Sequence, residues 1–485
     1  MELKKYKLGD IAKIEISGVD KKSVDGETPV RLCNFVDVYR NWAITQKLSE
    51  NFMIASAKET EIAKCSIHKG QVAITKDSET RDDIGIPAYI ADDFDNVLLG
   101  YHCALITPND DVLDGKYLNA FMHTRYIQKY FENNASGSGQ RYTLSNETIF
   151  QIPILLPSLE VQKAIGNLLS NIDRKIELNR QINDNLEKMA KQLYDYWFVQ
   201  FDFPNENGRP YKSSGGAMVW NEKLKREIPK EWDNCTLEYY GIIANGRDHK
   251  HLGNGIYPVY GSGGEIRKVD SFIYSGESIL MPRKGSLNNI MYVNDAFWSV
   301  DTMFYSEMKQ PHCAKYVFYS IKDIDFTRWD SGTGVPSMTS STLYSILLVK
   351  PDADSLAKFD EIITPLFLMI KKNEMQIVEL TKQRDDLLPL LMNGQASVNY
   401  HLSKWSIGFL CLDMHIEYDK DIVQKEADKQ DFNPLVRKPY SFTFFKHTSY
   451  PFFMFLLQFK LFVTMSHKLP TDFHNKVHTN VVQRF

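Results

Sequence analysis

Paired cysteines are missing from this chain of 485 residues. Its six cysteines, at positions 33, 65, 103, 235, 313 and 411, form no Cys-x-x-Cys motif, which argues against a zinc ribbon and against a disulfide framework. Residues 1–7 contain no apolar core of signal-peptide length, so we expect a cytoplasmic protein. The apolar stretch 450–465 is interrupted by Gln458 and Lys460 and is shorter than the ~20 residues of a membrane span, so we expect no membrane anchor.

Catalytic signatures are missing as well. The chain has no G-x-x-x-x-G-K-[ST] phosphate loop, no Gly-rich nucleotide fingerprint and no H-E-x-x-H metal pair. Asn433-Pro434 is followed by Leu435 and not by two aromatic residues, so it is not the motif of amino-methyltransferases. We therefore expect no catalytic residue and no metal site, and we interpret the acidic and histidine side chains of the loops as solvated.

An excess of positive charge is the third missing feature. The formal net charge is -4, whereas a DNA-binding domain usually has more basic than acidic residues. Residues 1–158 contain 18 Lys and Arg against 22 Asp and Glu, and residues 232–350 contain 11 against 12. Any contact with nucleic acid must therefore come from local patches.

What the chain does contain is an internal repeat with an offset of about 194 residues. The loop Ser136-Gly137-Ser138-Gly139 precedes the strand-like run 152–157 and a long helical pattern. In the same order, Ser331-Gly332-Thr333-Gly334 precedes the run 346–351 and a second long helical pattern. The segments 69–76 and 275–283 also correspond. An internal repeat of this length bears on the whole fold, and each copy reads as a globular domain followed by a helix.

The two globular parts mix short β-rich runs, such as 71–74 and 103–106, with helical stretches such as 117–122. This mixture predicts the α+β class. We predict a first globular domain at 1–158, a central helix at 159–200, a linker at 201–230, a second globular domain at 231–352, and a C-terminal helix at 353–395. Residues 396–485 depart from the repeat, because 12 of the 28 phenylalanines and six of the 12 histidines lie beyond residue 400.

Both long helices have an apolar seam typical of a coiled coil. The seam positions are Ile165, Leu168, Ile172, Asn179, Ile182, Leu186, Met189, Leu193 and Tyr196 in the first helix, and Phe359, Ile362, Leu366, Met369, Asn373, Leu380, Leu387 and Leu390 in the second. We predict that the helices pair antiparallel, with pseudo-twofold symmetry. The two equivalent asparagines either set the register or face solvent. Pro365 has no N–H, so we expect the regular part of the second helix to begin near it.

The loops offer chemistry for recognition. Met281 to Asn289 places Arg283, Lys284, Ser286, Asn288 and Asn289 on a Gly-containing turn. Arginine can bind a guanine edge and asparagine an adenine edge, while lysine and serine more often contact phosphates. The matching loop of the first half, 75–81, carries a different set of side chains. Two related folds with different loops are expected to read two different short sequences.

With these features in place, residues 5–395 resemble the specificity subunit of a type I restriction-modification enzyme. The resemblance is carried by 258–264, 282–286, 297–302, 384–389 and Asn393-Gly394, together with the repeated architecture. One difference is an inserted residue between Glu160 and Gln162, where the family has Glu-Gln. The tail after Gln395 also departs from the family, and we interpret it as an appended or rearranged segment.

The resemblance implies two target-recognition domains that each bind half of a bipartite, gapped DNA sequence, with the helix pair setting the gap. It implies methylation subunits that bring S-adenosylmethionine and restriction subunits that bring ATP and Mg²⁺, and no cofactor in this chain. The expected DNA-binding residues are Lys76, Ser78, Arg81, Arg141 and Tyr142 in the first domain and Arg283, Lys284, Ser286, Asn288 and Asn289 in the second. The alternatives are a coiled-coil assembly scaffold that reads no DNA, and a nuclease or methyltransferase active by itself.

Overall fold

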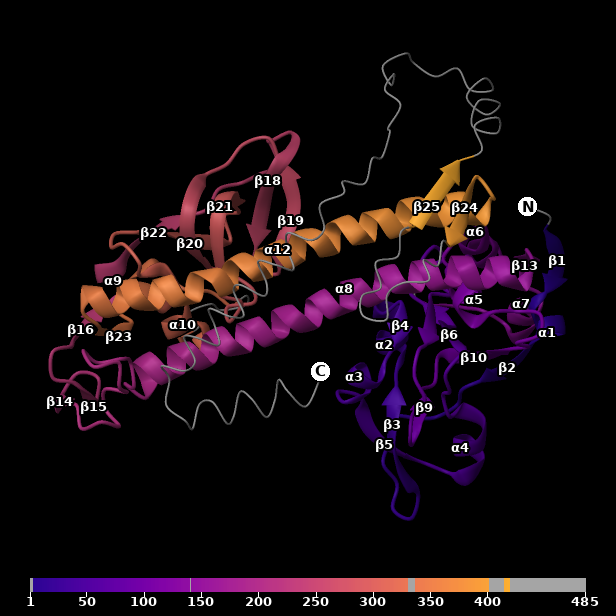
Figure 1. Cartoon of the computed structure of the whole chain (residues 1–485), viewed down its shortest axis with the longest axis horizontal. Helices are drawn as coiled ribbons and strands as arrows, with labels where there is room; N and C mark the ends of the chain where they lie inside the picture. Colours follow the sequence, from indigo (N-terminus) through magenta and orange to yellow (C-terminus); the bar gives the residue numbers. More distant parts are fainter. Residues whose placement is uncertain (1–2, 140, 330–335, 401–413, 419–485) are drawn as a thin grey trace. The chain divides into compact units, whose positions relative to one another are not determined.

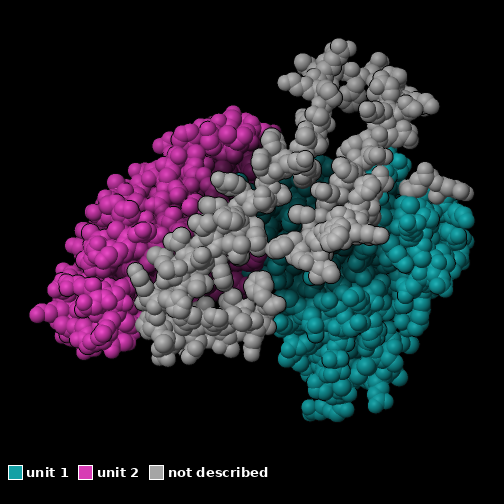
Figure 2. All heavy atoms as spheres, in the orientation of Figure 1, with its two compact units in different colours: residues 1–181, 373–438 teal, residues 182–372, 439–485 magenta. Residues whose placement is uncertain are grey.

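The computed structural model describes residues 3–139, 141–329, 336–400 and 414–418 (Figure 1). The chain divides into two compact units, shown in different colours in Figure 2. Unit 1 comprises residues 1–181 and 373–438, and unit 2 comprises residues 182–372 and 439–485. Both units combine helices with sheets, which confirms the predicted α+β class. In the described ranges, no helix has the length and apolar character needed to cross a membrane.

Unit 1 is built around a five-stranded sheet in the order β2-β10-β6-β8-β4. Side chains of its inner strands are buried on both faces, which explains their continuous apolar sequences. The strands of this unit are β1 (Lys4–Lys7), β2 (Ala12–Ile16), β3 (Thr28–Cys33), β4 (Ala43–Ile44), β5 (Met53–Ala57), β6 (Val72–Thr75), β7 (Asp77–Ser78), β8 (Pro87–Ile90), β9 (Val97–Leu99), β10 (Cys103–Pro108), β11 (Ser136–Ser138), β12 (Arg141–Thr143) and β13 (Pro153–Leu156).

Short helices cover and connect these strands. They are α1 (Leu8–Ile11), α2 (Phe35–Arg40), α3 (Gln46–Ser49), α4 (Glu59–Cys65), α5 (Gly115–Met122), α6 (Arg125–Asn134) and α7 (Asn146–Phe150). Two smaller sheets, β5-β3-β9 and β11-β12-β7, complete the described N-terminal part of the unit. The β11-β12-β7 sheet joins the Gly-rich loop of the sequence to the strand that follows β6.

Unit 2 contains a six-stranded sheet in the order β17-β22-β20-β21-β18-β19. The described strands of unit 2 are β14 (Met218–Asn221), β15 (Arg226–Pro229), β16 (Asp233–Thr236), β17 (Gly241–Asn245), β18 (Asn254–Gly261), β19 (Gly264–Val269), β20 (Tyr274–Pro282), β21 (Met291–Ser299), β22 (Met303–Met308) and β23 (Leu347–Lys350). Its shorter helices are α9 (Leu237–Tyr240), α10 (Ala314–Lys322), the 3₁₀ turn Phe326–Trp329, and α11 (Ser340–Tyr344).

The topology repeats between the units. The order β2-β10-β6 of unit 1 recurs as β17-β22-β20 in unit 2. In unit 1 the first strand, β1, pairs antiparallel with β13, which leads into the long helix α8 (Leu159–Tyr194). In unit 2 β16 pairs antiparallel with β23, which leads into α12 (Ala353–Met392). The duplication inferred from sequence is therefore present in the strand order.

The helices α8 and α12, magenta and orange in Figure 1, contribute to both units. The core of unit 1 includes Ile165, Leu168 and Ile172 of α8 together with Leu388 and Leu391 of α12. In the same unit Asp173 contacts Arg384, and Nδ2 of the buried Asn179 donates to Oε1 of Gln376 at 3.2 Å. Partner numbers fall along α12 as they rise along α8, so the contacts within unit 1 run antiparallel.

Two details of the second helix differ from the expectation. The helix begins at Ala353 and continues through Pro365, so the prediction that its regular part starts near this proline was wrong. Asp352 caps the first turn by accepting a hydrogen bond from the Ser355 N–H at 2.8 Å. Burial of Phe359 and Ile363 then stabilises the helix around the proline, which removes one backbone donor. Ile362, predicted in the seam, is 38% exposed, and Ile363 is buried in its place.

The segment 201–230, which its composition predicts to be a linker, is folded against unit 2. After α8 the chain forms a π-helical turn, Asp195–Val199, and then buries Phe201 and Phe203. The Phe203 ring stacks on Trp232 with centroids 4.5 Å apart, and Asp202 accepts hydrogen bonds from the backbone and side chain of Ser213. Strands β14 and β15 then form a hairpin.

Most of the predicted phenylalanine-rich tail, 396–485, lies outside the described residues. The described part forms β24 (Ala396–Tyr400) and β25 (Met414–Tyr418), which pair antiparallel. Ala396 is buried in the core of unit 1.

Candidate nucleic-acid interface

Lys76 immediately follows β6 and is held by its backbone from two sides. Its N–H donates to the carbonyl of His102 at 2.7 Å, and its own carbonyl accepts from the N–H of Leu144 at 2.9 Å. His102 belongs to the turn before β10, and Leu144 follows β12. Because both neighbours directly adjoin strands, the backbone around Lys76 is fixed while its half-buried side chain lies at the end of the sheet.

Arg283 occupies the equivalent place in unit 2. Its N–H donates to the carbonyl of Thr302 at 2.8 Å, and its carbonyl accepts from the N–H of Met338 at 2.9 Å. Thr302 lies in the turn before β22, as His102 lies in the turn before β10. The same pair of backbone hydrogen bonds therefore holds a basic residue at the end of β6 in unit 1 and at the end of β20 in unit 2.

The remaining candidates of the first domain gather around Lys76. Ser78 of β7 lies opposite Tyr142 of β12 in the strand register. The Arg81 guanidinium lies over the Tyr142 ring, 5.1 Å from its centroid. Arg141 and Tyr142 are neighbours in β12, so all five predicted residues of this domain belong to one group of loops and short strands. The prediction that these side chains contact DNA itself stays a prediction.

Asp77 and His102, which are not among the predicted DNA-binding residues, lie at the centre of this group. Asp77 Oδ2 contacts His102 Nδ1, and it also accepts a hydrogen bond from Arg141 Nη2 at 3.2 Å. Burial alone would raise the pKa of the Asp77 carboxyl, but hydrogen bonds from Thr143, His102 and Arg141 hold this pKa below its ordinary value. Asp77 therefore remains ionised at neutral pH. Alignment of the two repeats could have indicated the position of His102, but not its contacts.

The second-domain candidates divide into two groups. Arg283, Lys284 and Ser286 have exposed side chains, and the Arg283 guanidinium lies 5.9 Å from the centroid of the Phe304 ring. Asn288 and Asn289 instead bind within the unit. Asn288 Oδ1 accepts from the N–H of Phe326 at 2.8 Å, and Asn289 Nδ2 donates to the carbonyl of Ser262 at 2.8 Å. In this structure both amides support the loop, so the surface offered to a ligand consists mainly of the two cations and the hydroxyl.

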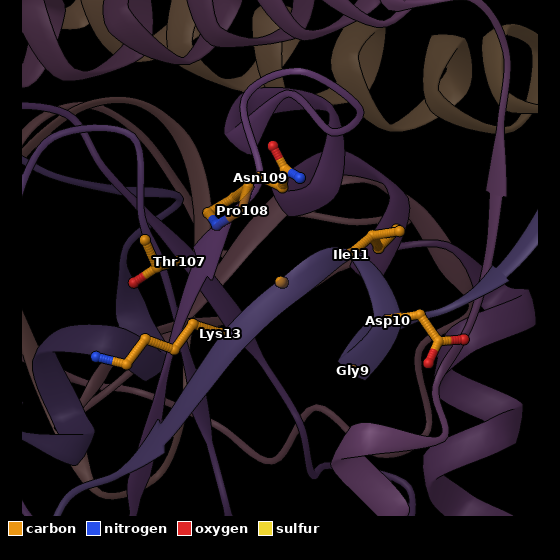
Figure 3. Close-up of a pocket in the computed structure, with 8 residues that line it drawn as sticks. Gly9, Asp10, Ile11, Lys13, Thr107, Pro108 and Asn109 are labelled. Carbon is orange, nitrogen blue, oxygen red and sulfur yellow. The ribbon is translucent and has the colours of Figure 1, made fainter.

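A shallow pocket lies elsewhere in unit 1, between β2, β10 and the turns beside them. It is lined by Gly9, Asp10, Ile11, Ala12, Lys13, Thr107, Pro108 and Asn109. The Asp10 and Lys13 side chains point away from each other in Figure 3. The pocket contains none of the predicted recognition residues, and its lining shows no pair of groups arranged for acid–base chemistry.

Comparison with known proteins places this geometry in context. Residues 1–188 match the family described as "Type I restriction modification DNA specificity domain". The chain is 26% identical over 383 residues to the type I restriction enzyme MjaIX specificity subunit of Methanocaldococcus jannaschii, covering 70% of this chain and 81% of the relative. It is 23% identical over 416 residues to the HindI specificity subunit of Haemophilus influenzae, covering 69% and 88%.

A similar fold occurs in a solved structure, the S subunit of a type I restriction-modification system from M. genitalium. The TM-score is 0.53 at 16% sequence identity, and the match covers 81% of this chain and 96% of that chain. At this level of identity the likeness concerns the fold. It extends over both repeats and agrees with the α+β architecture described above.

Proposed function

We propose that this chain is a type I restriction-modification specificity subunit that binds a bipartite, gapped sequence in double-stranded DNA, because residues 1–188 match the family's domain and most of the chain is similar to two such subunits. Each unit reads one half of that sequence. The observation that carries the proposal is the repeated strand end, where one pair of backbone hydrogen bonds holds Lys76 in unit 1 and Arg283 in unit 2. A fixed backbone with different side chains is what two related readers of two different half-sites require.

The neighbouring side chains support different specificities for the two units. Lys76 is followed by Asp77 and Ser78, whereas Arg283 is followed by Lys284 and a glycine. The first set combines a cation with a carboxylate and a hydroxyl, and the second set places two cations together. Arginine distinguishes guanine through its two acceptors in the major groove, while a lysine most often contacts phosphate. We therefore assign Lys76, Ser78, Arg81, Arg141 and Tyr142 to one half-site, and Arg283, Lys284 and Ser286 to the other.

In this proposal α8 and α12 pair as an antiparallel coiled coil that sets the gap between the half-sites. A helix of 36 residues, as in α8, is roughly 54 Å long. Successive half-sites on one face of B-DNA lie about 34–36 Å apart, so a helix of this length matches the scale of a gapped site. The antiparallel contacts within unit 1, such as Asn179 with Gln376, support this pairing.

The proposal also includes partner subunits. Methylation subunits would bring S-adenosylmethionine, and restriction subunits would bring ATP and Mg²⁺, while this chain supplies the DNA sequence specificity. The near balance of charge in the chain supports such a division, because partner subunits can provide most of the phosphate contacts. Neither a membrane nor a cofactor of its own has a part in this function.

The test is to map methylated bases by long-read sequencing of DNA from cells that produce this chain with the methylation subunit of its own system. The expected result is a methylated motif with two specified parts separated by a gap of fixed length. The double variant Arg283→Ala, Lys284→Ala should change or remove one part only. A stable complex that leaves the DNA unmodified would contradict the proposal and favour an assembly scaffold. Methylation by the isolated chain would show that it is an enzyme by itself.

A further inference from the structure

A carboxylate lies inside the group of basic and polar residues of unit 1. Asp77 is 17% exposed at its side chain, whereas the Arg141 side chain that it contacts is 63% exposed. Asp77 Oδ2 accepts from Arg141 Nη2 at 3.2 Å and also contacts His102 Nδ1. The carboxylate thus lies beneath the arginine, and the imidazole lies beside both.

This carboxylate contributes little as a surface ion pair. Ion pairs with an exposed arginine contribute little to stability, and a negative charge weakens the attraction of a surface for phosphates. Its evident effect is on geometry. Among the described residues, the contacts of the Arg141 guanidinium all involve Nη2, which donates to Asp77 Oδ2 and lies beside the His102 ring. The N–H groups of Nε and Nη1 can therefore donate to a ligand, and the contact with Asp77 sets the orientation of the guanidinium plane.

His102 limits the freedom of the arginine from the other side. Its backbone adopts a φ of 71°, which is uncommon for a residue other than glycine, and its carbonyl receives the hydrogen bond from Lys76. Uncommon backbone conformations persist where the surroundings hold them, and they concentrate at functional sites. The imidazole places Nδ1 2.7 Å from Arg141 Nη2, so the ring and the carboxylate together enclose one end of the guanidinium.

We propose that Asp77 is a positioning residue that, with His102, orients Arg141 to read a guanine in the half-site bound by unit 1. This inference rests on the proposed function. A guanidinium recognises guanine by donating two parallel hydrogen bonds to O6 and N7, which requires a fixed plane. In the described part of unit 2, Lys284 stands in the place of Asp77, and Thr302 in the place of His102. The effect of Asp77 is therefore confined to one half of the recognised sequence.

The experiment uses the complete complex of this chain with its methylation subunit, and plasmids in which each base of the methylated motif is varied. We compare the wild type with Asp77→Asn, which keeps the shape of the side chain but removes its charge. Arg141→Lys keeps the positive charge but removes the planar group. Glu79→Gln is the matched control, because Glu79 is an exposed acid in the same loop with no assigned part in the site. Thermal melting of each variant reports its folding.

We expect Asp77→Asn and Arg141→Lys to lower the preference for guanine at one position by roughly 10- to 100-fold, the range for loss of one bidentate contact. The other half of the motif, the melting temperature and the Glu79→Gln control should be unchanged. The proposal is overturned if a folded Asp77→Asn keeps the wild-type motif, if Arg141→Lys keeps it, or if both halves lose specificity together. If Asp77→Asn fails to fold, Asp77→Glu, which keeps the charge but displaces the carboxylate, takes its place. If the wild-type complex methylates no two-part motif, the proposed function itself is contradicted.

Discussion

Replacing Lys315 by methionine should destabilise unit 2 strongly. Lys315 lies on α10, and its side chain is only 4% exposed. Its Nζ donates to Glu277 Oε1 on β20 at 2.6 Å and to Asp360 Oδ1 on α12 at 2.8 Å. It also lies over the Tyr292 ring of β21, 5.5 Å from the centroid. One cation therefore connects the sheet of unit 2 to the helix that follows it.

The magnitude follows from what the substitution leaves behind. Methionine fills a similar volume, but the two carboxylates then share a partly buried site without their cation. Breaking a buried ion pair typically costs about 3–5 kcal/mol. Here Asp360 is 17% exposed and Glu277 30% exposed, and they keep hydrogen bonds from His312 and Tyr292. We therefore expect about 3 kcal/mol, which corresponds to a fall of about 6–12 °C in the melting temperature of a domain of this size.

The pH dependence gives a second measure of the same network. Burial favours the neutral form of Asp360, but hydrogen bonds from Lys315 and His312 hold its pKa below the ordinary value of 3.8. A lowered folded-state pKa contributes stability that is present above pH ~4 and is lost as pH falls through the folded value. In Lys315→Met this acid-linked loss should become smaller, because the main partner of the carboxylate is gone.

The assay is differential scanning calorimetry of the wild type, Lys315→Met, and a triple variant that adds Glu277→Gln and Asp360→Asn. The triple variant removes the uncompensated charges and should recover most of the lost stability. The reasoning would be refuted by a single variant that melts within 2 °C of the wild type. It would also be refuted if the triple variant were no more stable than the single one.

Three further predictions concern other parts of the molecule. Burial raises the pKa of Asp173 to about 6 despite the Arg384 guanidinium, so its favourable contribution is lost as pH rises through 6. In urea titrations we expect the unfolding free energy of the wild type to decrease by roughly 2 kcal/mol between pH 4 and pH 7 from this group, and Asp173→Asn should lack this decrease. In Gly115→Ala the new Cβ would lie 2.0 Å from the Gly70 carbonyl oxygen, so calorimetry should show a loss of more than about 2 kcal/mol. If unit 2 binds DNA as proposed, Lys284→Ala should reduce the slope of log affinity against log salt by about 1 in fluorescence anisotropy, without changing the preferred bases.

Several features of the site were open to sequence reasoning because they are local or repeated. The repeated order of segments indicated that 69–76 and 275–283 correspond, and the structure places Lys76 and Arg283 at equivalent strand ends. Asn288 and Asn289 show where such reasoning stops. Their amides suited recognition of adenine, yet they bind Phe326 and Ser262, which approach them only in the folded chain.

The two long helices show the same division. Most of their seam positions could be read from the spacing of apolar residues, since helical periodicity is a local property, although Ile362 was assigned to the seam in place of Ile363. The continuation of α12 through Pro365 could not be predicted from local sequence, because burial of Phe359 and Ile363 in unit 2 offsets the loss of one backbone donor. Local propensity is a weak guide wherever tertiary packing contributes more free energy than the backbone preference.

By itself, the sequence determined the duplication, the α+β class, the two long helices and the resemblance to type I specificity subunits, because each of these depends on patterns along the chain. The tertiary structure alone decided which side chains meet. It showed that Asp77, His102 and Arg141 converge from three separate segments, and that each unit includes helical segments from both halves of the chain. The physical reason is that hydrogen bonds and ion pairs depend on distances of about 3 Å, which spacing along the chain does not define.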